Sequence, residues 1–75
     1  MTKITEQTFE LKKDHPYIQL NNLLQVLHIA QTGGHAKLII QNNDVMVNGE
    51  IETRVRKKLT HSDVILVGNQ SITIA

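Results

Sequence analysis

The hydrophobic residues of this chain recur with a helical period in two neighbouring stretches. In the first stretch the spacing is i, i+3, i+4 and i+7, at Leu20, Leu23, Leu24 and Leu27. Such spacing places apolar side chains on one face of a helix, so we predict a helix over residues 18–28. Residues 1–7 are polar and are expected to be loose, and Pro16 ends any regular element that precedes the helix.

The second stretch predicts a shorter helix with capping residues at both ends. Its apolar stripe is Ala36, Ile39 and Ile40. Thr32 precedes the stripe, where its side chain can accept a hydrogen bond from the first turn. Asn43 follows the stripe, and asparagine tolerates the left-handed backbone with which many helices end. We therefore expect this helix to run from about Thr32 to about Asn43.

Most of the other hydrophobic positions belong to short strands. The sequence predicts strands at residues 8–11, 45–47, 64–67 and 71–74. Asn48-Gly49 is a strong hairpin signal, because these two residue types adopt the positive φ angles of a type I′ turn at little cost. Glu50 begins the return strand, and Gly68-Asn69 marks a second hairpin turn.

Together these elements define an α+β fold in one domain over residues 1–75. We predict two packed helices against a small, mostly antiparallel sheet of four to five strands, with Ile39 and Val47 in the core. A chain of 75 residues buries only about 60% of its unfolded surface, so few core residues carry most of its stability.

Composition excludes several functional classes. There is no cysteine, hence no disulfide, thiolate metal site or cysteine nucleophile. No apolar run approaches the ~20 residues of a membrane span and the N-terminus does not resemble a signal peptide, so we expect a cytoplasmic protein without membrane contact. The histidines lack the i, i+4 spacing of a helical zinc site, and no serine stands in a nucleophile elbow. We therefore expect no metal, no cofactor and no enzymatic activity.

The cationic residues are concentrated in one short segment. The net charge is only +1, but half of the eight Lys and Arg residues lie at Arg54, Arg56, Lys57 and Lys58. An ordinary solvated surface would show the same run of charge. In an extended segment, however, Arg54, Arg56 and Lys58 would share one side and could bind phosphate oxygens together. We therefore predict that this segment binds a polyanion.

A second anion-binding element is predicted at the start of the second helix. Free backbone N–H groups and the helix dipole favour anions there. Gly33 and Gly34 would let a phosphate approach the backbone, and His35 and Lys37 could contact it. The alternative is that Lys37 is an ordinary exposed helix residue and that His35 stays in solvent. We predict Gly34, His35 and Lys37 as site residues.

The order of these parts resembles a known family, the RNA-binding domain named after the fourth protein of the small ribosomal subunit, also called the αL motif. The matching residues are Leu20, Asn21, Leu24, Ala30, Thr32, Ala36, Lys37, Ile39, Ile40, Val45, Val47, Asn48, Gly49, Ser62, Asp63 and Ile65. They cover about residues 19–67, and the valine-x-valine-asparagine-glycine hairpin is more specific than the leucine helix. The resemblance implies a small, free-standing RNA-binding protein of a type that occurs in bacteria.

The chain departs from the family pattern at several positions. Gln19 and Gly33 stand where the family usually carries arginine, and Asn21 replaces an aspartate. His28 and Asn43 replace two common glycines. The RNA contacts that the two arginines would make cannot be carried over to this chain.

The basic cluster and the resemblance together predict a non-catalytic monomer that holds structured RNA, with ribosomal and transfer RNA as candidates. Only Phe9 and Tyr17 are aromatic, and Phe9 is expected in the core, so there is no platform on which successive bases could stack. We expect recognition of RNA shape and backbone instead. The alternative is a protein-interaction adaptor that uses its apolar surface or acidic hairpin. A ubiquitin-like carrier is disfavoured, because the chain ends Thr73-Ile74-Ala75 without a diglycine.

Overall fold

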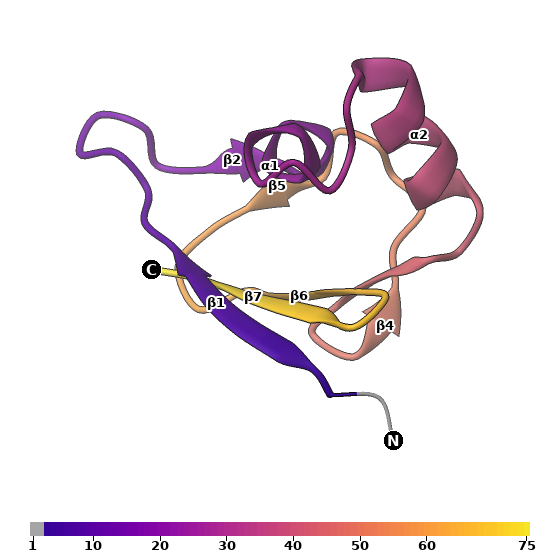
Figure 1. Ribbon diagram of the computed structural model, residues 1–75. Helices are drawn as coiled ribbons and strands as arrows, with labels where there is room; N and C mark the ends of the chain where they lie inside the picture. Colours follow the sequence, from indigo (N-terminus) through magenta and orange to yellow (C-terminus); the bar gives the residue numbers. More distant parts are fainter. Residues whose placement is uncertain (1–2) are drawn as a thin grey trace.

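Two helices and a short two-stranded ladder lie over one face of a five-stranded sheet. The computed structural model describes residues 3–75. Their elements are β1 (Thr5–Phe9), β2 (Ile18–Gln19), α1 (Leu20–Val26), α2 (Gly33–Gln41), β3 (Val45–Val47), β4 (Glu50–Ile51), β5 (Lys58–Leu59), β6 (Val64–Val67) and β7 (Gln70–Ile74). The sheet has the order β1-β7-β6-β3-β4, and β2 pairs with β5 beside the helices (Figure 1). The predicted fold class is confirmed.

The sheet is antiparallel except at one edge. β3 pairs antiparallel with β4 and β6, and β6 with β7, whereas β1 runs parallel to β7. β1 begins at Thr5, three residues before the predicted strand at 8–11, and residues 5–7, expected to be loose, are paired. β1 is an edge strand with mostly exposed side chains, so the hydrophobic pattern carries little signal for it.

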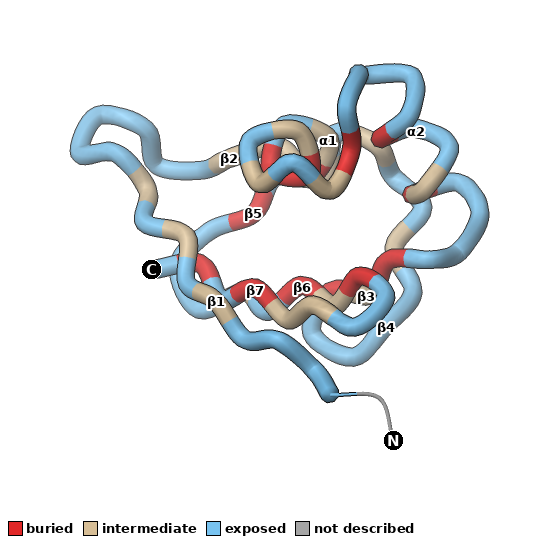
Figure 2. The backbone as a smooth tube through the Cα atoms, viewed as in Figure 1, coloured by how far each residue is buried: buried red, intermediate tan, exposed pale blue. Residues whose placement is uncertain are grey.

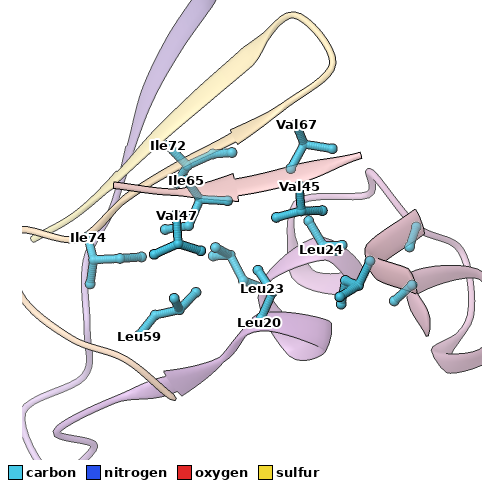
Figure 3. Packing of buried hydrophobic residues seen from close by; sticks show 13 residues of the cluster. Leu20, Leu23, Leu24, Val45, Val47, Leu59, Ile65, Val67, Ile72 and Ile74 are labelled. Carbon is cyan, nitrogen blue, oxygen red and sulfur yellow. The ribbon is translucent and has the colours of Figure 1, made fainter. Parts of the chain in front are cut away.

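The core lies between the two layers. Its buried residues are Leu20, Leu23, Leu24, Ala30, Ala36, Ile40, Val45, Val47, Leu59, Ile65, Val67, Ile72 and Ile74. Figure 2 shows these segments on the facing sides of the layers, and Figure 3 shows the leucines of α1 opposite the valines and isoleucines of the sheet. Val47 is a core residue, as predicted. Ile39 is only half-buried and packs against the core from its margin.

Helix α1 is shorter than the predicted span of residues 18–28. The first two predicted residues belong to β2, and His28 has a left-handed backbone with φ 60°. The N–H of His28 donates to the carbonyl of Gln25 (3.0 Å), and that of Ile29 donates to the carbonyl of Leu24 (2.9 Å). This pair of hydrogen bonds closes a helix around a left-handed residue. The leucine spacing does not reveal it, because that spacing reports the apolar face of a helix and not the backbone conformation at its end.

Helix α2 begins and ends with the predicted caps. The side chain of Thr32 accepts a hydrogen bond from the N–H of His35 (3.0 Å). Asn43 follows the helix with φ 63°, and the N–H of Asp44 donates to the carbonyl of Ile39 (3.4 Å). His28 and Asn43, the two residues that replace family glycines, therefore both occupy left-handed backbone positions. Glycine is the residue that takes this conformation without strain, which explains the family pattern there.

Candidate nucleic-acid interface

The basic segment, residues 54–58, connects β4 to β5 and is held against the start of α1. The N–H of Leu20 donates to the carbonyl of Lys57 (2.9 Å), and the N–H of Asn21 donates to that of Val55 (3.0 Å). α1 has no side-chain cap at this end, so the carbonyls of the basic segment satisfy N–H groups that would otherwise lack partners. The backbone of the cationic residues is thereby fixed relative to the helical layer.

The predicted extended conformation of the basic segment is wrong. The N–H of Lys57 donates to the carbonyl of Arg54 (3.2 Å), and the chain turns at Val55 and Arg56 before it enters β5 at Lys58. The turn brings two alternate carbonyls toward the start of α1, while Val55 packs against the core. Arg54, Arg56 and Lys58 therefore do not share one side of a strand. The geometry of the basic segment is set by the N–H groups at the start of α1, which is distant in sequence. The local alternation of side chains therefore could not predict it.

Arg54 is already paired with a carboxylate. Its Nε and Nη2 atoms donate to Oε2 and Oε1 of Glu52, both at 3.0 Å. This paired hydrogen bond from Arg54 holds the pKa of Glu52 below its usual range, against the opposing effect of burial. The pair uses two of the five N–H donors of the guanidinium and offsets its charge, so a phosphate is attracted to Arg54 less strongly than to an unpaired arginine. Within residues 3–75, Arg56, Lys57 and Lys58 make no salt bridge, so they carry the unpaired charges of the basic segment. Arg56 and Lys58 are exposed, whereas Lys57 is half-buried.

An aromatic side chain lies next to the basic segment. The Nζ atom of Lys58 is 4.9 Å from the ring centroid of Tyr17. Tyr17 precedes β2, and β2 pairs with β5 in the register Ile18 to Leu59 and Gln19 to Lys58. Sequence reasoning missed this contact, because no local signal joins Tyr17 to a cation so far along the chain.

The start of α2 carries Gly34, His35 and Lys37, all exposed. His35 is partly engaged in capping, because its Nδ1 atom accepts a hydrogen bond from the N–H of Gln31 (3.2 Å). Only its Nε2 atom remains for a ligand. A Cβ atom at Gly34 would meet only Oγ1 of Thr32, at 3.9 Å, so packing within the protein does not require glycine there.

The two predicted groups of site residues belong to different elements of one layer. The start of α2 and the basic segment both lie on the helical side of the sheet (Figure 1). No hydrogen bond or salt bridge among the described residues joins them. The structure thus brings Arg56, Lys57 and Lys58 together with α1 and Tyr17, and it keeps Gly34, His35 and Lys37 as a separate group.

The hairpin motif has a structural role that sequence reasoning missed. Asn48 and Gly49 have φ angles of 52° and 86°, which confirms the predicted turn. The side chain of Asn48 accepts a hydrogen bond from the N–H of Val64 (2.9 Å) and donates one to Oδ1 of Asp63 (3.0 Å). The other carboxylate oxygen of Asp63 accepts from the N–H of Thr60 (2.8 Å). This hairpin clamp ties β3 to the start of β6.

The hairpin clamp makes stability depend on pH. Burial raises the pKa of Asp63, but hydrogen bonds from Thr60 and Asn48 and the charge of Lys57 outweigh it, so the net shift is downward. A carboxyl group whose pKa is lowered by folding stabilises the fold above its unfolded pKa and loses that contribution on acidification. The lowered pKa of Glu52 acts in the same direction. We expect stability to decline as the pH falls below about 5.

We predict that Asp63→Asn lowers stability at pH 7 by about 1 kcal/mol and reduces the further loss between pH 5 and pH 2, because an amide cannot accept at both positions. Urea denaturation across this pH range measures both effects. Asp14→Asn is the matched control, since Asp14 is exposed in the loop before β2. An Asp63→Asn profile that falls with acid as steeply as the unmodified profile would contradict the role of the clamp.

Across residues 3–75, no three His, Asp or Glu side chains are grouped so that they could hold a metal ion. None of the helices in these residues has the length and apolar character that crossing a membrane requires.

Fold and site together define a small αL-type domain with a basic segment docked on its first helix. The chain belongs to the S4 domain family, because the family model of that description matches residues 9–75. The resemblance inferred from the sequence is thereby confirmed.

The relatives of this chain include small bacterial proteins. The Escherichia coli K12 protein named "Putative RNA-binding protein YbcJ" is 33% identical over 67 residues, which are 89% of this chain and 94% of the relative. YbcJ of Shigella flexneri matches with the same values, 33% over 67 residues. The solution structure of YbcJ from E. coli, described as revealing an αL motif involved in RNA binding, superimposes with a TM-score of 0.68 at 32% identity. That match covers 91% of this chain and 85% of the other.

Proposed function

We propose that this protein is a non-catalytic, monomeric RNA-binding protein that holds structured RNA on a basic surface. The surface consists of the start of α2, with Gly34, His35 and Lys37, and of the basic segment. The observation that carries the proposal is the docking of the basic segment on α1 in a member of the S4 domain family. The description of YbcJ as a protein with an RNA-binding αL motif supports it.

The proposed surface combines a fixed backbone with exposed cationic side chains. The hydrogen bonds from Leu20 and Asn21 hold the backbone of the basic segment, while the side chains of Arg56 and Lys58 are exposed. Such cations bind phosphates without reading base identity. Arg54 has a structural role in this surface, because its pair with Glu52 holds the start of the basic segment in place. We therefore assign direct phosphate contacts to Arg56, Lys57 and Lys58.

Structured RNA is favoured over unstructured RNA by the scarcity of aromatic side chains. Proteins that hold long single strands use successive rings on which the bases stack. Phe9 packs against the core here, which leaves one ring beside the basic segment. A helix or junction instead presents phosphates and 2′-hydroxyl groups at fixed spacing, which suits a fixed set of cations.

Competition binding at a fixed, near-physiological salt concentration tests the proposal. We expect a folded RNA stem-loop to bind more tightly than poly-uridine or duplex DNA of equal length, and a scrambled stem that keeps its pairing to bind about equally well. Affinity should fall steeply as salt is raised, because bound cations release counterions from the RNA. Equal affinity for all three polymers would reduce the interaction to nonspecific charge attraction.

The alternative function, a protein-interaction adaptor, is favoured by one feature of the open sheet face. Ile51, Met46 and Leu66 are directly paired across β4, β3 and β6, and Ile51 is 59% exposed. A partner docked on this row would bind through apolar contacts that depend little on salt. The same salt titration therefore separates the two functions, since only RNA binding has a steep dependence.

A further inference from the structure

We infer that Tyr17, Gln19 and Lys58 form a binding site for a single unpaired nucleotide, whose base stacks on the Tyr17 ring. This inference rests on the proposed function and adds a site beside the phosphate-binding cations. It also refines the expectation that no aromatic platform exists: the protein offers one ring, which is enough for one base but not for a run of bases.

The register of the small ladder places two of these side chains on its outer face. Ile18 pairs with Leu59, and Gln19 pairs with Lys58. Residues directly opposed in a ladder share a face, and successive residues alternate between faces. Leu59 is fully buried and Ile18 packs against the core. Gln19 and Lys58 therefore point away from the core.

Tyr17 joins the same outer face. Its ring lies 4.9 Å from the Nζ atom of Lys58, and the residue is 38% exposed. Phe9, by contrast, packs against the core. Tyr17 is thus the aromatic side chain that an external ligand can reach, and it stands directly beside the basic segment.

The three side chains provide complementary contacts for a nucleotide. The Tyr17 ring offers a surface for stacking, and the Gln19 amide, which does not cap α1, can both donate to and accept from a base edge. The Lys58 ammonium suits the phosphate. An exposed cation–π contact is weaker than base stacking, so a base can displace Lys58 from the ring toward the phosphate. Gln19 stands where the family usually carries arginine, and its amide, unlike a guanidinium, can also accept a hydrogen bond from a base edge.

The chain provides its own optical probe for this site. Tyr17 is the sole tyrosine and there is no tryptophan, so intrinsic fluorescence reports on Tyr17 alone. The first RNA probe is a hairpin with one unpaired 3′ adenosine, and the second carries an abasic residue at that position. We expect the first hairpin to quench the fluorescence and the abasic hairpin to bind about ten-fold more weakly without quenching.

Substitutions at Tyr17 separate stacking from charge. Tyr17→Leu should weaken binding of the adenosine hairpin about ten-fold, remove its advantage over the abasic hairpin and leave the salt dependence unchanged. Tyr17→Phe should retain the affinity, because it keeps the ring. Ile4→Ala is the matched control for loss of an exposed apolar side chain, as Ile4 is 57% exposed in front of β1. It should change neither affinity nor preference.

The outcomes distinguish this site from the proposed function. Tight binding of both hairpins with equal affinity and unchanged fluorescence would overturn the nucleotide site and leave RNA binding intact. If neither hairpin binds, the proposed function fails, and adenosine 5′-monophosphate alone decides the site. Quenching by the mononucleotide, retained when Arg56 and Lys57 are replaced by alanine, supports the site. Unchanged fluorescence at saturating mononucleotide overturns it.

Discussion

Replacing Arg56, Lys57 and Lys58 together by alanine is expected to reduce RNA affinity sharply while the fold remains intact. These side chains carry the charges of the basic segment that are not held by a carboxylate. Arg56 and Lys58 are exposed, and exposed charges contribute little to stability. Lys57 is half-buried and its charge helps to lower the pKa of Asp63, so the thermal midpoint should fall modestly without loss of the fold. Each lost phosphate contact flattens the dependence of log K on log salt by ~0.7–0.9, so the triple variant should flatten it by about 2–3. Arg54 stays in place, because removing it would leave Glu52 without its partner.

The matched control replaces Lys3, Lys12 and Lys13 by alanine. It removes the same charge from exposed positions outside the basic segment. If RNA bound through general electrostatic attraction alone, both triple variants would lose affinity equally. A defined surface predicts a much larger loss of affinity in the first variant. If the first variant keeps both its affinity and its salt dependence, the binding face lies elsewhere on the molecule.

Val47→Asp is expected to have the largest effect on stability. Val47 is 8% exposed in β3 and lies in the core between the sheet and the helical layer (Figure 3). A carboxylate there would lose its hydration without gaining a partner, at a cost of about 3 kcal/mol or more. Each kcal/mol lowers the thermal midpoint of so small a domain by about 4–8 °C, so a fall of about 12–24 °C is expected. Thermal unfolding followed by circular dichroism measures it.

Met46→Asp is the matched control for this substitution. Met46 neighbours Val47 on the same strand but lies on the opposite face of the sheet, where it is only half-buried. Its replacement should cost much less, since the carboxylate can reach water. Equal effects at Met46 and Val47 would show that the faces of β3 are not distinguished by burial.

The parts of the fold that could be predicted are those set by local signals. Thr32 caps α2 because a threonine side chain directly before the apolar stripe can accept a hydrogen bond from the first turn of the helix. Asn48-Gly49 forms its turn because both residues tolerate positive φ. β1 could not be placed correctly, since its pairing with β7 satisfies the backbone while its side chains remain mostly exposed.

The candidate site could be predicted in composition but not in geometry. The concentration of charge at residues 54–58 is visible in the sequence, whereas the turn within it depends on the N–H groups of Leu20 and Asn21. The neutralisation of Arg54 by Glu52 requires a conformation in which two nearby side chains meet, and spacing alone does not fix that. Tyr17 reaches Lys58 only through the pairing of β2 with β5.

The parallel pairing of β1 with β7 has a consequence for the order of folding. Thr5 pairs with Gln70 and Phe9 with Ile74, so β1 can pair only after β7 is available. The helices and the β3–β4 hairpin can form before β1 and β7 meet, because their contacts are local. β1 can join the sheet only when residues 70–74 are in place to pair with it. Closure of so long a loop is entropically costly, so the β1 edge should complete the sheet last.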